Sequence, residues 1–203
     1  QQILDKIEAK KSPVELNAFI NGRETSIVRD NPDDPEHYGK EVTLKIYDRR
    51  EIAGGMSTYQ IAEQPILRTP DSIDHNRRGD FMLLINGIPV IHVELKKSGV
   101  PVIQACNQIK KYYHEGVYTG IFRLIQIFIA MTPEESLYFA NPGSEENFNE
   151  RYYFHWGDFN NDRVNDWQEV ADRIMSIPME HMMVGFYTVA DKGDDTLKVM
   201  RSY

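Results

Sequence analysis

The clearest pattern of apolar and polar positions lies between Asp80 and Lys96. Two runs of alternating residues flank the pair Asn86-Gly87, which is the strongest short-range signal for a β-hairpin. The apolar members of both runs stand at odd positions, namely Phe81, Leu83, Ile85, Ile91, Val93 and Leu95. Because side chains along a strand point alternately to its two faces, the odd positions share one face, which we expect to turn toward the core.

The even positions carry polar residues, and the register of the hairpin decides which of them meet. If both strands turn their odd residues to the core, the numbers of two facing residues must add to an even total. A two-residue turn at Asn86-Gly87 would pair residue 85 with residue 88, which gives an odd total. We therefore predict a three-residue loop over 85–87 with its glycine in the left-handed region, or a compensating β-bulge. In either arrangement Asp80 lies across from Glu94, and Lys96 follows on the same face.

The same two periodicities predict further elements on both sides of the hairpin. Strands are expected over 41–46, 58–67, 124–131, 137–140, 186–190 and 197–200. Helices are expected over 101–113, after Asp166 with Glu169 as a capping box, and near Pro178. Turn residues predict a loop over 31–35 and a break at Gly54-Gly55. The order hairpin, helix, strand, strand indicates an α/β fold with a mixed central sheet flanked by helices.

Composition limits the class of protein. The 203 residues are 41% hydrophobic and 27% charged, which suits one globular domain with extensions rather than a disordered or fibrous chain. Cys106 is the only cysteine, so an internal disulfide framework and a multi-cysteine zinc site are excluded. No apolar run is long enough to cross a membrane, and the first residues lack a basic leader. We expect a cytoplasmic protein with no membrane partner.

Charge is unevenly distributed along the chain. The net charge of -8 argues against a free-standing nucleic-acid binder, because neutralising phosphates takes clustered lysine and arginine. The segment from Arg68 to Arg123 reverses the balance, since its eight basic and five acidic residues give +3 and leave -11 for the rest. A solvated surface with scattered lysines would give the same count, but the candidate chemistry falls inside this segment.

Asp80 and Glu94 place two carboxylates on one face, where they raise each other's pKa unless a cation lies between them. Mg²⁺ suits such ligands because it takes one or two carboxylates, keeps several waters and meets substrate phosphate. Lys96 beside the ion can hold the attacking water and offset charge that develops on the phosphate. This chemistry is phosphodiester hydrolysis. The alternative is that Glu94 and Lys96 form an exposed ion pair at a strand end.

The predicted helix over 101–113 adds a polar pair. Gln108 and Tyr112 are four residues apart, so they share a face and can reach the same end of the hairpin. His92 shares the face of Glu94, but a lone histidine between apolar strand residues is interpreted as packed, and we leave it out of the predicted site.

These residues resemble the motifs of a known nuclease superfamily. Asp80, Glu94-Leu95-Lys96 and Gln108 with Tyr112 are similar to the Asp, Glu-x-Lys and Gln-x-x-x-Tyr motifs of PD-(D/E)xK nucleases of the RecB-like kind. The chain also resembles the N-terminal nuclease domain of the restriction (R) subunit of type I restriction-modification enzymes over 76–80, 84–89, 93–96, 107–109 and 126–129. Residues 199–203 resemble that family's entry into its ATP-driven motor, so the chain would be a fragment of a larger subunit.

The resemblance implies a restriction-endonuclease-like α/β core and a Mg²⁺-dependent endonuclease that cuts double-stranded DNA. It also implies a complex with modification (M) and specificity (S) subunits, in which ATP is used by motor domains absent from this chain. We expect a single nuclease domain over 1–203, with its core at about 58–141. Residues 142–203 would form a C-terminal extension leading into the motor.

The resemblance also assigns roles to single residues. Asp80 and Glu94 become metal ligands with the Leu95 carbonyl as a third, Lys96 becomes the catalytic lysine, Gln108 and Tyr112 become the accessory pair, and Arg77 and Lys110 are expected to contact DNA. Such nucleases often carry an acidic residue on a helix well before the hairpin, and no residue here is recognisable as its counterpart. Two alternatives stay open: an exonuclease or junction resolvase of the same superfamily, and a catalytically silent docking module of the complex.

Overall fold

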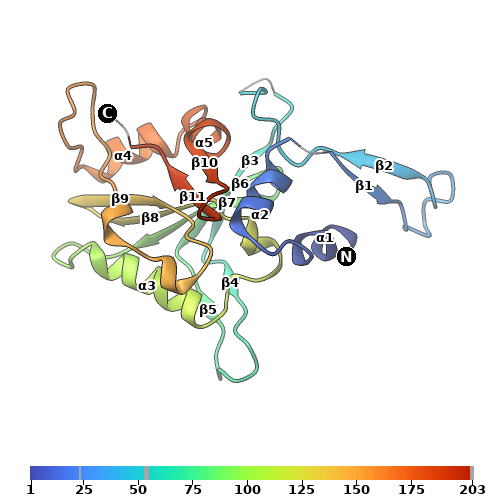
Figure 1. Ribbon diagram of the computed structural model, residues 1–203, viewed down its shortest axis with the longest axis horizontal. Coiled ribbons are helices and arrows are strands. Elements are labelled where there is room, and N and C mark those ends of the chain that lie inside the picture. Colours follow the sequence, from blue (N-terminus) through green and yellow to red (C-terminus); the bar gives the residue numbers. More distant parts are fainter. Residues whose placement is uncertain (23, 53–54, 202–203) are drawn as a thin grey trace.

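The computed structural model describes residues 1–22, 24–52 and 55–201, and its centre is a mixed sheet of five strands in the order β3-β6-β7-β8-β9 (Figure 1). The strands are β3 (Tyr59–Glu63), β6 (Phe81–Ile85), β7 (Ile88–Leu95), β8 (Ile127–Thr132) and β9 (Glu135–Ala140). Only β7 and β8 run parallel, and the chain between them forms helix α3 (Ile103–His114). A parallel pair needs such a crossover. The predicted order of hairpin, helix, strand, strand is confirmed.

The β6–β7 hairpin differs from the prediction at its turn. Asn86 and Gly87 have φ values of 53° and 79° and form a two-residue turn, with Ile85 paired to Ile88. The predicted three-residue loop is wrong, because both residues take the positive φ that a type I′ turn needs. Further along the described register, Val90 of β7 has no partner on β6. This β-bulge is the predicted alternative, and beyond it the odd residues of both strands share one face.

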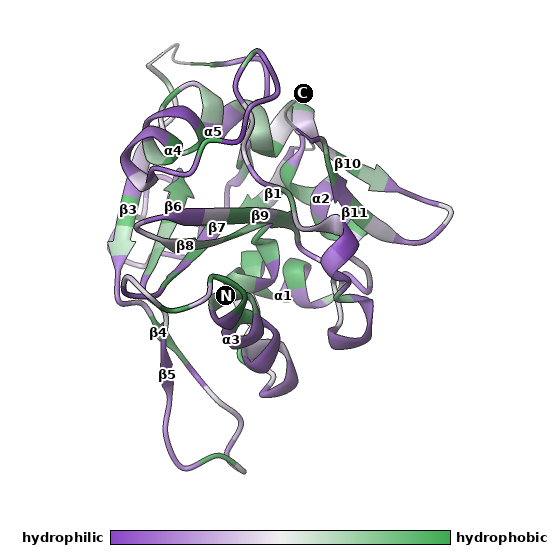
Figure 2. Ribbon diagram, turned by 90° about the vertical axis from the view of Figure 1, so that its left-hand side faces the viewer, coloured by the Kyte–Doolittle hydropathy of each residue, from purple (hydrophilic) through white to green (hydrophobic). Residues whose placement is uncertain are grey.

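Elements cover both faces of the central sheet over β6 to β9, whereas the edge strand β3 is largely exposed (Figure 2). One face carries the odd residues of the hairpin and packs against α2 (Pro13–Ile20), α4 (Trp167–Ile174) and the hairpin of β10 (Thr188–Asp191) and β11 (Thr196–Val199). Helix α3 covers the other face with Ala105, Cys106, Ile109 and Tyr112, against Met82, Phe128 and Ala130 of the sheet. The expected burial of the odd positions holds at Leu83, Ile85, Ile91 and Val93. Phe81 is only half-buried, and Leu95 is 39% exposed because it ends its strand. Because α3 covers the other face, the even positions of the hairpin lie beneath this helix.

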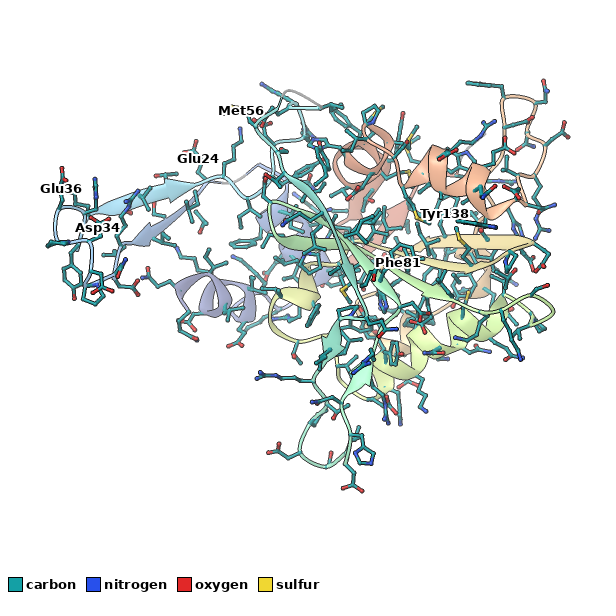
Figure 3. All side chains as sticks on the ribbon, turned by 180° about the vertical axis from the view of Figure 1, so that it is seen from behind. Glu24, Asp34, Glu36, Met56, Phe81 and Tyr138 are labelled. Carbon is teal, nitrogen blue, oxygen red and sulfur yellow. The ribbon has the colours of Figure 1, made fainter. Side chains whose placement is uncertain are left out.

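Smaller elements project from this core. The hairpin of β1 (Thr25–Val28) and β2 (Glu41–Leu44) forms an arm, and the ribbon of β4 (Ile66–Leu67) and β5 (Arg77–Arg78) leads into β6 (Figure 1). Asp34 and Glu36 lie at the tip of the arm, whereas Phe81 and Tyr138 lie in the centre of the molecule (Figure 3). Helix α1 (Gln2–Glu8) completes the N-terminal part. Of the predicted break at Gly54-Gly55, Gly54 lies outside the described residues and Gly55 has a positive φ of 81°. Residues 202 and 203 of the closing motif also lie outside the described residues.

The C-terminal elements confirm the sequence pattern with small shifts in their bounds. Helix α5 spans Met179–Met182 directly after Pro178, and the predicted last strand pair is β10–β11. The strand predicted over 124–131 begins only at Ile127, because a 3₁₀ turn precedes it. No helix in the described part of the chain is long and apolar enough to cross a membrane.

The N-terminus of α4 is capped as predicted. The Asp166 side chain accepts hydrogen bonds from the backbone amides of Gln168 and Glu169, at 3.0 and 3.1 Å. The capping box is only half formed, because the Glu169 carboxylate pairs with Arg173 one turn later, at 2.6 Å. The cap satisfies two of the four amides that a helix N-terminus leaves without partners.

Replacing this cap is expected to destabilise the chain measurably. Asp166→Ala should lower the free energy of unfolding by about 1 kcal/mol, because it leaves both amides to solvent alone. Urea denaturation followed by circular dichroism would measure the change. Asp172→Ala, on the exposed side of the same helix, is the matched control and should stay within about 0.5 kcal/mol of the wild type. Equal losses in the two variants would contradict the role of Asp166.

Candidate active site at the ends of strands β6 and β7

Two acidic side chains meet where β6 begins and β7 ends. Phe81 pairs with Val93, so one further step of the antiparallel register places Asp80 opposite Glu94. The Asp80 carboxylate accepts a hydrogen bond from the Leu95 amide at 2.6 Å, which fixes it against the end of β7. The structure thus brings together the two carboxylates that the alternation of the hairpin predicts on one face.

Glu94 is almost completely buried, with a relative exposure of 1%. Burial raises the pKa of Glu94, and the negative charge of Asp80 adds to the rise. The Oε1 atom lies 3.6 Å from the Nζ atom of Lys96. Among the described residues, the Oε2 atom has no hydrogen-bond partner. A buried carboxylate with an unused oxygen gains stability from a cation placed beside it.

Lys96 connects this cluster to solvent and to α3. Its ammonium donates to the Leu95 carbonyl at 3.0 Å and to the side-chain oxygen of Gln108. The side chain remains 22% exposed, and it lines a surface hollow of about 230 Å³ together with Trp167. A cation that is both held by the protein and accessible from outside can meet an incoming anionic group.

Gln108 and Tyr112 bridge α3 and the start of the hairpin. Gln108 donates from Nε2 to the Tyr112 hydroxyl at 2.6 Å, and that hydroxyl donates to the Arg78 carbonyl at 3.1 Å. Burial raises the pKa of Tyr112 to about 12, so the hydroxyl keeps its proton at neutral pH. The pair therefore faces the end of the hairpin, where the helical spacing predicts it, and Gln108 also holds Lys96.

The two residues expected to contact DNA have different surroundings. Arg77 forms a two-fold ion pair with Glu115 at the end of α3, with both N–O distances at 2.7 Å. This contact lowers the pKa of Glu115. Lys110 lies on the exposed side of α3. The structure gives Arg77 a contact that braces β5 against α3, and it leaves the ammonium of Lys110 facing solvent.

The donor set fits a hard divalent cation of the Mg²⁺ type. Asp80 and Glu94 offer carboxylate oxygens, and the next residue, Leu95, offers a backbone carbonyl oxygen that also accepts from the Lys96 ammonium. Mg²⁺ commonly takes one or two carboxylates and fills its remaining positions with water. Across 1–22, 24–52 and 55–201, no group of three or more His, Cys, Asp or Glu side chains could hold a metal. The further acidic residue expected from the resemblance is not found at this site within these ranges.

His92 belongs to the surroundings of the site although the sequence pattern left it out. Its Nε2 atom lies 3.4 Å from the Oε2 atom of Glu94, and both side chains are buried. The one signal in the sequence is that His92 and Glu94 are two residues apart on one strand. The structure confirms that the histidine is packed, and it adds the contact with Glu94.

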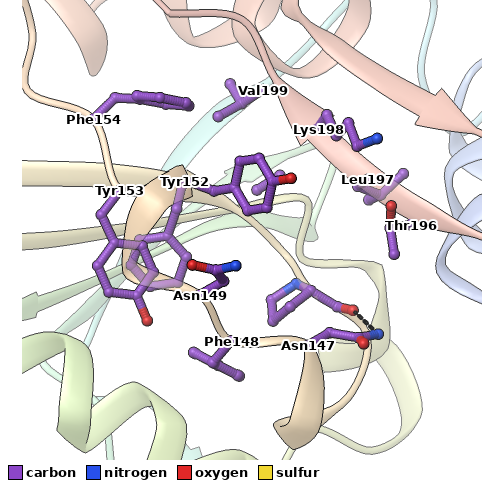
Figure 4. A pocket seen from close by; sticks show the side chains of 13 residues that line it. Asn147, Phe148, Asn149, Tyr152, Tyr153, Phe154, Thr196, Leu197, Lys198 and Val199 are labelled. Atoms are coloured by element: carbon purple, nitrogen blue, oxygen red, sulfur yellow. Dashed lines mark hydrogen bonds between the residues drawn. The ribbon is translucent and has the colours of Figure 1, made fainter. Parts of the chain in front are cut away.

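A separate apolar cavity of about 220 Å³ lies between the segment 147–154 and β11 (Figure 4). Tyr152 and Tyr153 line it, and Asn147 is held at its rim by a 3.2 Å hydrogen bond to the Pro142 carbonyl. The predicted site residues all lie in the described part of the chain, and none of them lines this cavity. This cavity is therefore separate from the carboxylate cluster, whose Leu95 and Lys96 line the hollow beside Trp167.

The fold and the site define a mixed α/β domain with two carboxylates and a lysine at the ends of adjacent strands. Residues 2–147 match the family described as Type I restriction enzyme R protein N terminus (HSDR_N), and the chain belongs to this family.

Named relatives agree with this assignment. The SsaAORF53P endonuclease subunit of Staphylococcus saprophyticus is 30% identical over 194 residues, which cover 93% of this chain and 20% of that protein. The SauCOLORF180P endonuclease subunit of Staphylococcus aureus is 37% identical over 129 residues, which cover 64% and 14%. The EcoprrI endonuclease subunit of Escherichia coli is 30% identical over 132 residues, which cover 64% and 42%. All three are type I restriction enzyme subunits, and the chain spans less than half the length of each.

Proposed function

We propose that the chain is the Mg²⁺-dependent DNA endonuclease domain of a type I restriction enzyme R subunit, built on a PD-(D/E)xK core. It would hydrolyse phosphodiester bonds of unmodified double-stranded DNA in the cytoplasm, within a complex that also holds M and S subunits. Motor domains outside this chain would use ATP. The observation that carries the proposal is the meeting of Asp80, Glu94 and Lys96 at the strand ends of a member of this family.

Asp80, Glu94 and the Leu95 carbonyl would hold the cation. A bound Mg²⁺ polarises a phosphoryl oxygen and lowers the pKa of a coordinated water. The protein prepares this position, since the Leu95 amide fixes Asp80 and burial removes water from Glu94. The same burial makes the empty carboxylate pair unfavourable, which supports binding of a divalent ion.

Lys96 would orient the attacking water and offset the negative charge that grows on the phosphate. Its contacts with the Leu95 carbonyl and Gln108 hold the ammonium at the edge of the carboxylate pair. Tyr112 keeps Gln108 in place and is itself bonded to the backbone ahead of Asp80. Helix α3 thereby sets the position of the lysine relative to the strands.

The domain as a whole would depend on its complex to bind DNA. The net charge of -8 gives weak affinity for phosphates, so the M and S subunits and the motor would bring the duplex to the site. Lys110 is placed to contact the backbone of that duplex, and Arg77 would do so only by sharing its guanidinium with Glu115. Residues 58–141 would supply the nuclease core, and 142–203 would lead toward the motor.

Measuring divalent-ion binding separates the nuclease proposal from the alternative that the chain is a catalytically silent docking module. A docking module has no functional need for a cation at Asp80 and Glu94. In the full-length subunit without nucleotide, Asp80→Ala is expected to weaken Mn²⁺ binding more than about tenfold, because even the loss of a group that only orients a ligand costs about tenfold. Electron paramagnetic resonance of free Mn²⁺ would measure the affinity.

Asp74→Ala is the matched control, since Asp74 is an exposed carboxylate on the loop of the β4–β5 ribbon. It should leave the affinity for Mn²⁺ unchanged. Unchanged Mn²⁺ binding in the Asp80→Ala subunit would place the docking module ahead of the nuclease. A RecB-like exonuclease or resolvase would bind the ion equally well, but it would degrade linear ends or cut junctions in preference to closed plasmid.

A further inference from the structure

His92 is buried beneath α3, next to Glu94 of the candidate site. Its side chain has a relative exposure of 0%, and its ring stacks on Tyr112 with a centroid distance of 6.1 Å and an interplanar angle of 14°. The Nδ1 atom lies 2.9 Å from the hydroxyl of Tyr118. The other ring nitrogen, Nε2, points at the Oε2 atom of Glu94 at 3.4 Å.

The two facing atoms share an unusual property. In the described part of the chain, neither Nε2 of His92 nor Oε2 of Glu94 has a hydrogen-bond partner. Buried polar atoms without partners are rare and costly, and here a donor and an acceptor of complementary kind stand a few tenths of an ångström beyond hydrogen-bond distance. A small movement of the Glu94 side chain would satisfy both atoms at once.

A second buried histidine shows that burial alone does not produce this arrangement. His181 also has a relative exposure of 0%, but each of its ring nitrogens faces a neutral oxygen. These are the Tyr59 hydroxyl at 2.8 Å and the Asp48 carbonyl at 2.9 Å. His181 therefore acts as a structural bridge, whereas His92 turns one nitrogen to a carboxylate.

The two neighbours of His92 together indicate where the ring hydrogen lies. An ionised carboxylate such as Glu94 only accepts hydrogen bonds, whereas the Tyr118 hydroxyl, whose pKa is raised by burial, can donate to Nδ1. When it donates to Nδ1, the ring hydrogen resides on Nε2, which faces Glu94. Gly79 packs closely against the imidazole, since any larger residue at position 79 would place its Cβ atom 2.8 Å from Nε2. The imidazole is thus held between the residue before Asp80 and the carboxylate of Glu94.

We propose that His92 is a positioning residue, which donates from Nε2 to Oε2 of Glu94 and, oriented by Tyr118, leaves the other carboxylate oxygen directed at the divalent cation. The inference rests on the proposed function, because it takes Glu94 to be a ligand of that cation. Carboxylates that bind metals are commonly held by a second hydrogen bond of this kind, and losing the partner weakens metal binding 10- to 100-fold.

Replacement of His92 by residues of similar size separates positioning from packing. His92→Leu fills the space without a donor, whereas His92→Gln carries an amide nitrogen that can reach the place of Nε2. In the full-length subunit without nucleotide, His92→Leu is expected to weaken Mn²⁺ binding about tenfold, and His92→Gln should stay within about threefold of the wild type. Tyr118→Phe removes only the hydroxyl and should give an intermediate loss. His181→Gln is the control, and it should lower thermal stability without changing the affinity for Mn²⁺.

The outcomes are distinct. Wild-type affinity in His92→Leu or in Tyr118→Phe would overturn the inference while the metal site stands. Equal losses in His92→Leu and His92→Gln would also overturn it, because the imidazole would then bind the ion itself. If His92→Leu does not fold, Tyr118→Phe decides alone. If Asp80→Ala leaves Mn²⁺ binding intact, the proposed function fails, and the inference fails with it.

Discussion

Plasmid cleavage by a reconstituted complex that carries Lys96→Ala in the full-length subunit is expected to fall at least about 100-fold, while ATP turnover in the same tubes persists. The lysine ammonium lies 3.6 Å from Glu94 and is held by Gln108, so its loss removes the positive charge next to the reacting phosphate. The motor should be unaffected, because the proposed function assigns ATP use to domains outside this chain. Gel analysis of supercoiled, nicked and linear plasmid, with phosphate release recorded in parallel, measures both activities.

Lys97→Ala is the matched control for this experiment. It removes the same charge one residue later, from an exposed side chain that alternation directs away from Glu94. Cleavage by this variant should stay within about twofold of the wild type. Cutting by the Lys96→Ala complex at the wild-type rate would show that the site is wrongly assigned and would favour the docking module.

Glu180→Gln is expected to stabilise the chain at alkaline pH by up to about 4 kcal/mol. Glu180 on α5 has a relative exposure of 3%, and burial raises its pKa to about 8. The folded chain therefore binds more protons than the unfolded chain between about pH 4.5 and 8. Stability must fall as the pH rises through this window, because folding then requires an uncompensated buried charge. Glutamine has the same shape and remains neutral, so the variant should lose this pH dependence.

Urea denaturation at pH 5.5 and 8.5 would measure the effect. Glu180→Gln should exceed the wild type in free energy of unfolding by only about 1 kcal/mol at pH 5.5, one unit above the unfolded pKa, and by about 4 kcal/mol at pH 8.5. Glu169→Gln is the control, because Glu169 is exposed in an ion pair on α4 and should change stability by less than about 0.5 kcal/mol at either pH. Parallel pH profiles for the wild type and Glu180→Gln would show that Glu180 is not the group responsible.

The site follows from the sequence because alternation along a strand is a strict rule. Asp80 and Glu94 stand at even positions of one hairpin, so any register that buries the odd residues brings them to the same face. The turn itself was harder to predict. Asn86 tolerates positive φ, which allows the two-residue turn. The sequence signal for the bulge at Val90 is Pro89 beside it, because a proline inside a strand cannot donate to the ladder and is common at bulges.

Contacts between distant segments were beyond the sequence pattern. The pairing of Arg77 with Glu115 joins residues 38 positions apart, and it depends on how β5 approaches the end of α3. The contact of His92 with Glu94 was missed for a related reason. The sequence pattern predicts burial of the odd face and a packed His92, but it does not predict that α3 covers the even face and encloses His92 together with Glu94. Periodicity gives the faces of an element, but not which neighbour covers each face.

The bulge at Val90 bears on how this family can change in evolution. The number of residues between the turn and Glu94 can change by one only if a bulge is gained or lost with it, because otherwise one strand's apolar side chains would turn to the opposite face. Deletion of the unpaired Val90 would remove the bulge and still leave Leu83 opposite Ile91 and Asp80 opposite Glu94. A one-residue insertion without a second bulge would instead separate the two carboxylates even though every residue of the site survived.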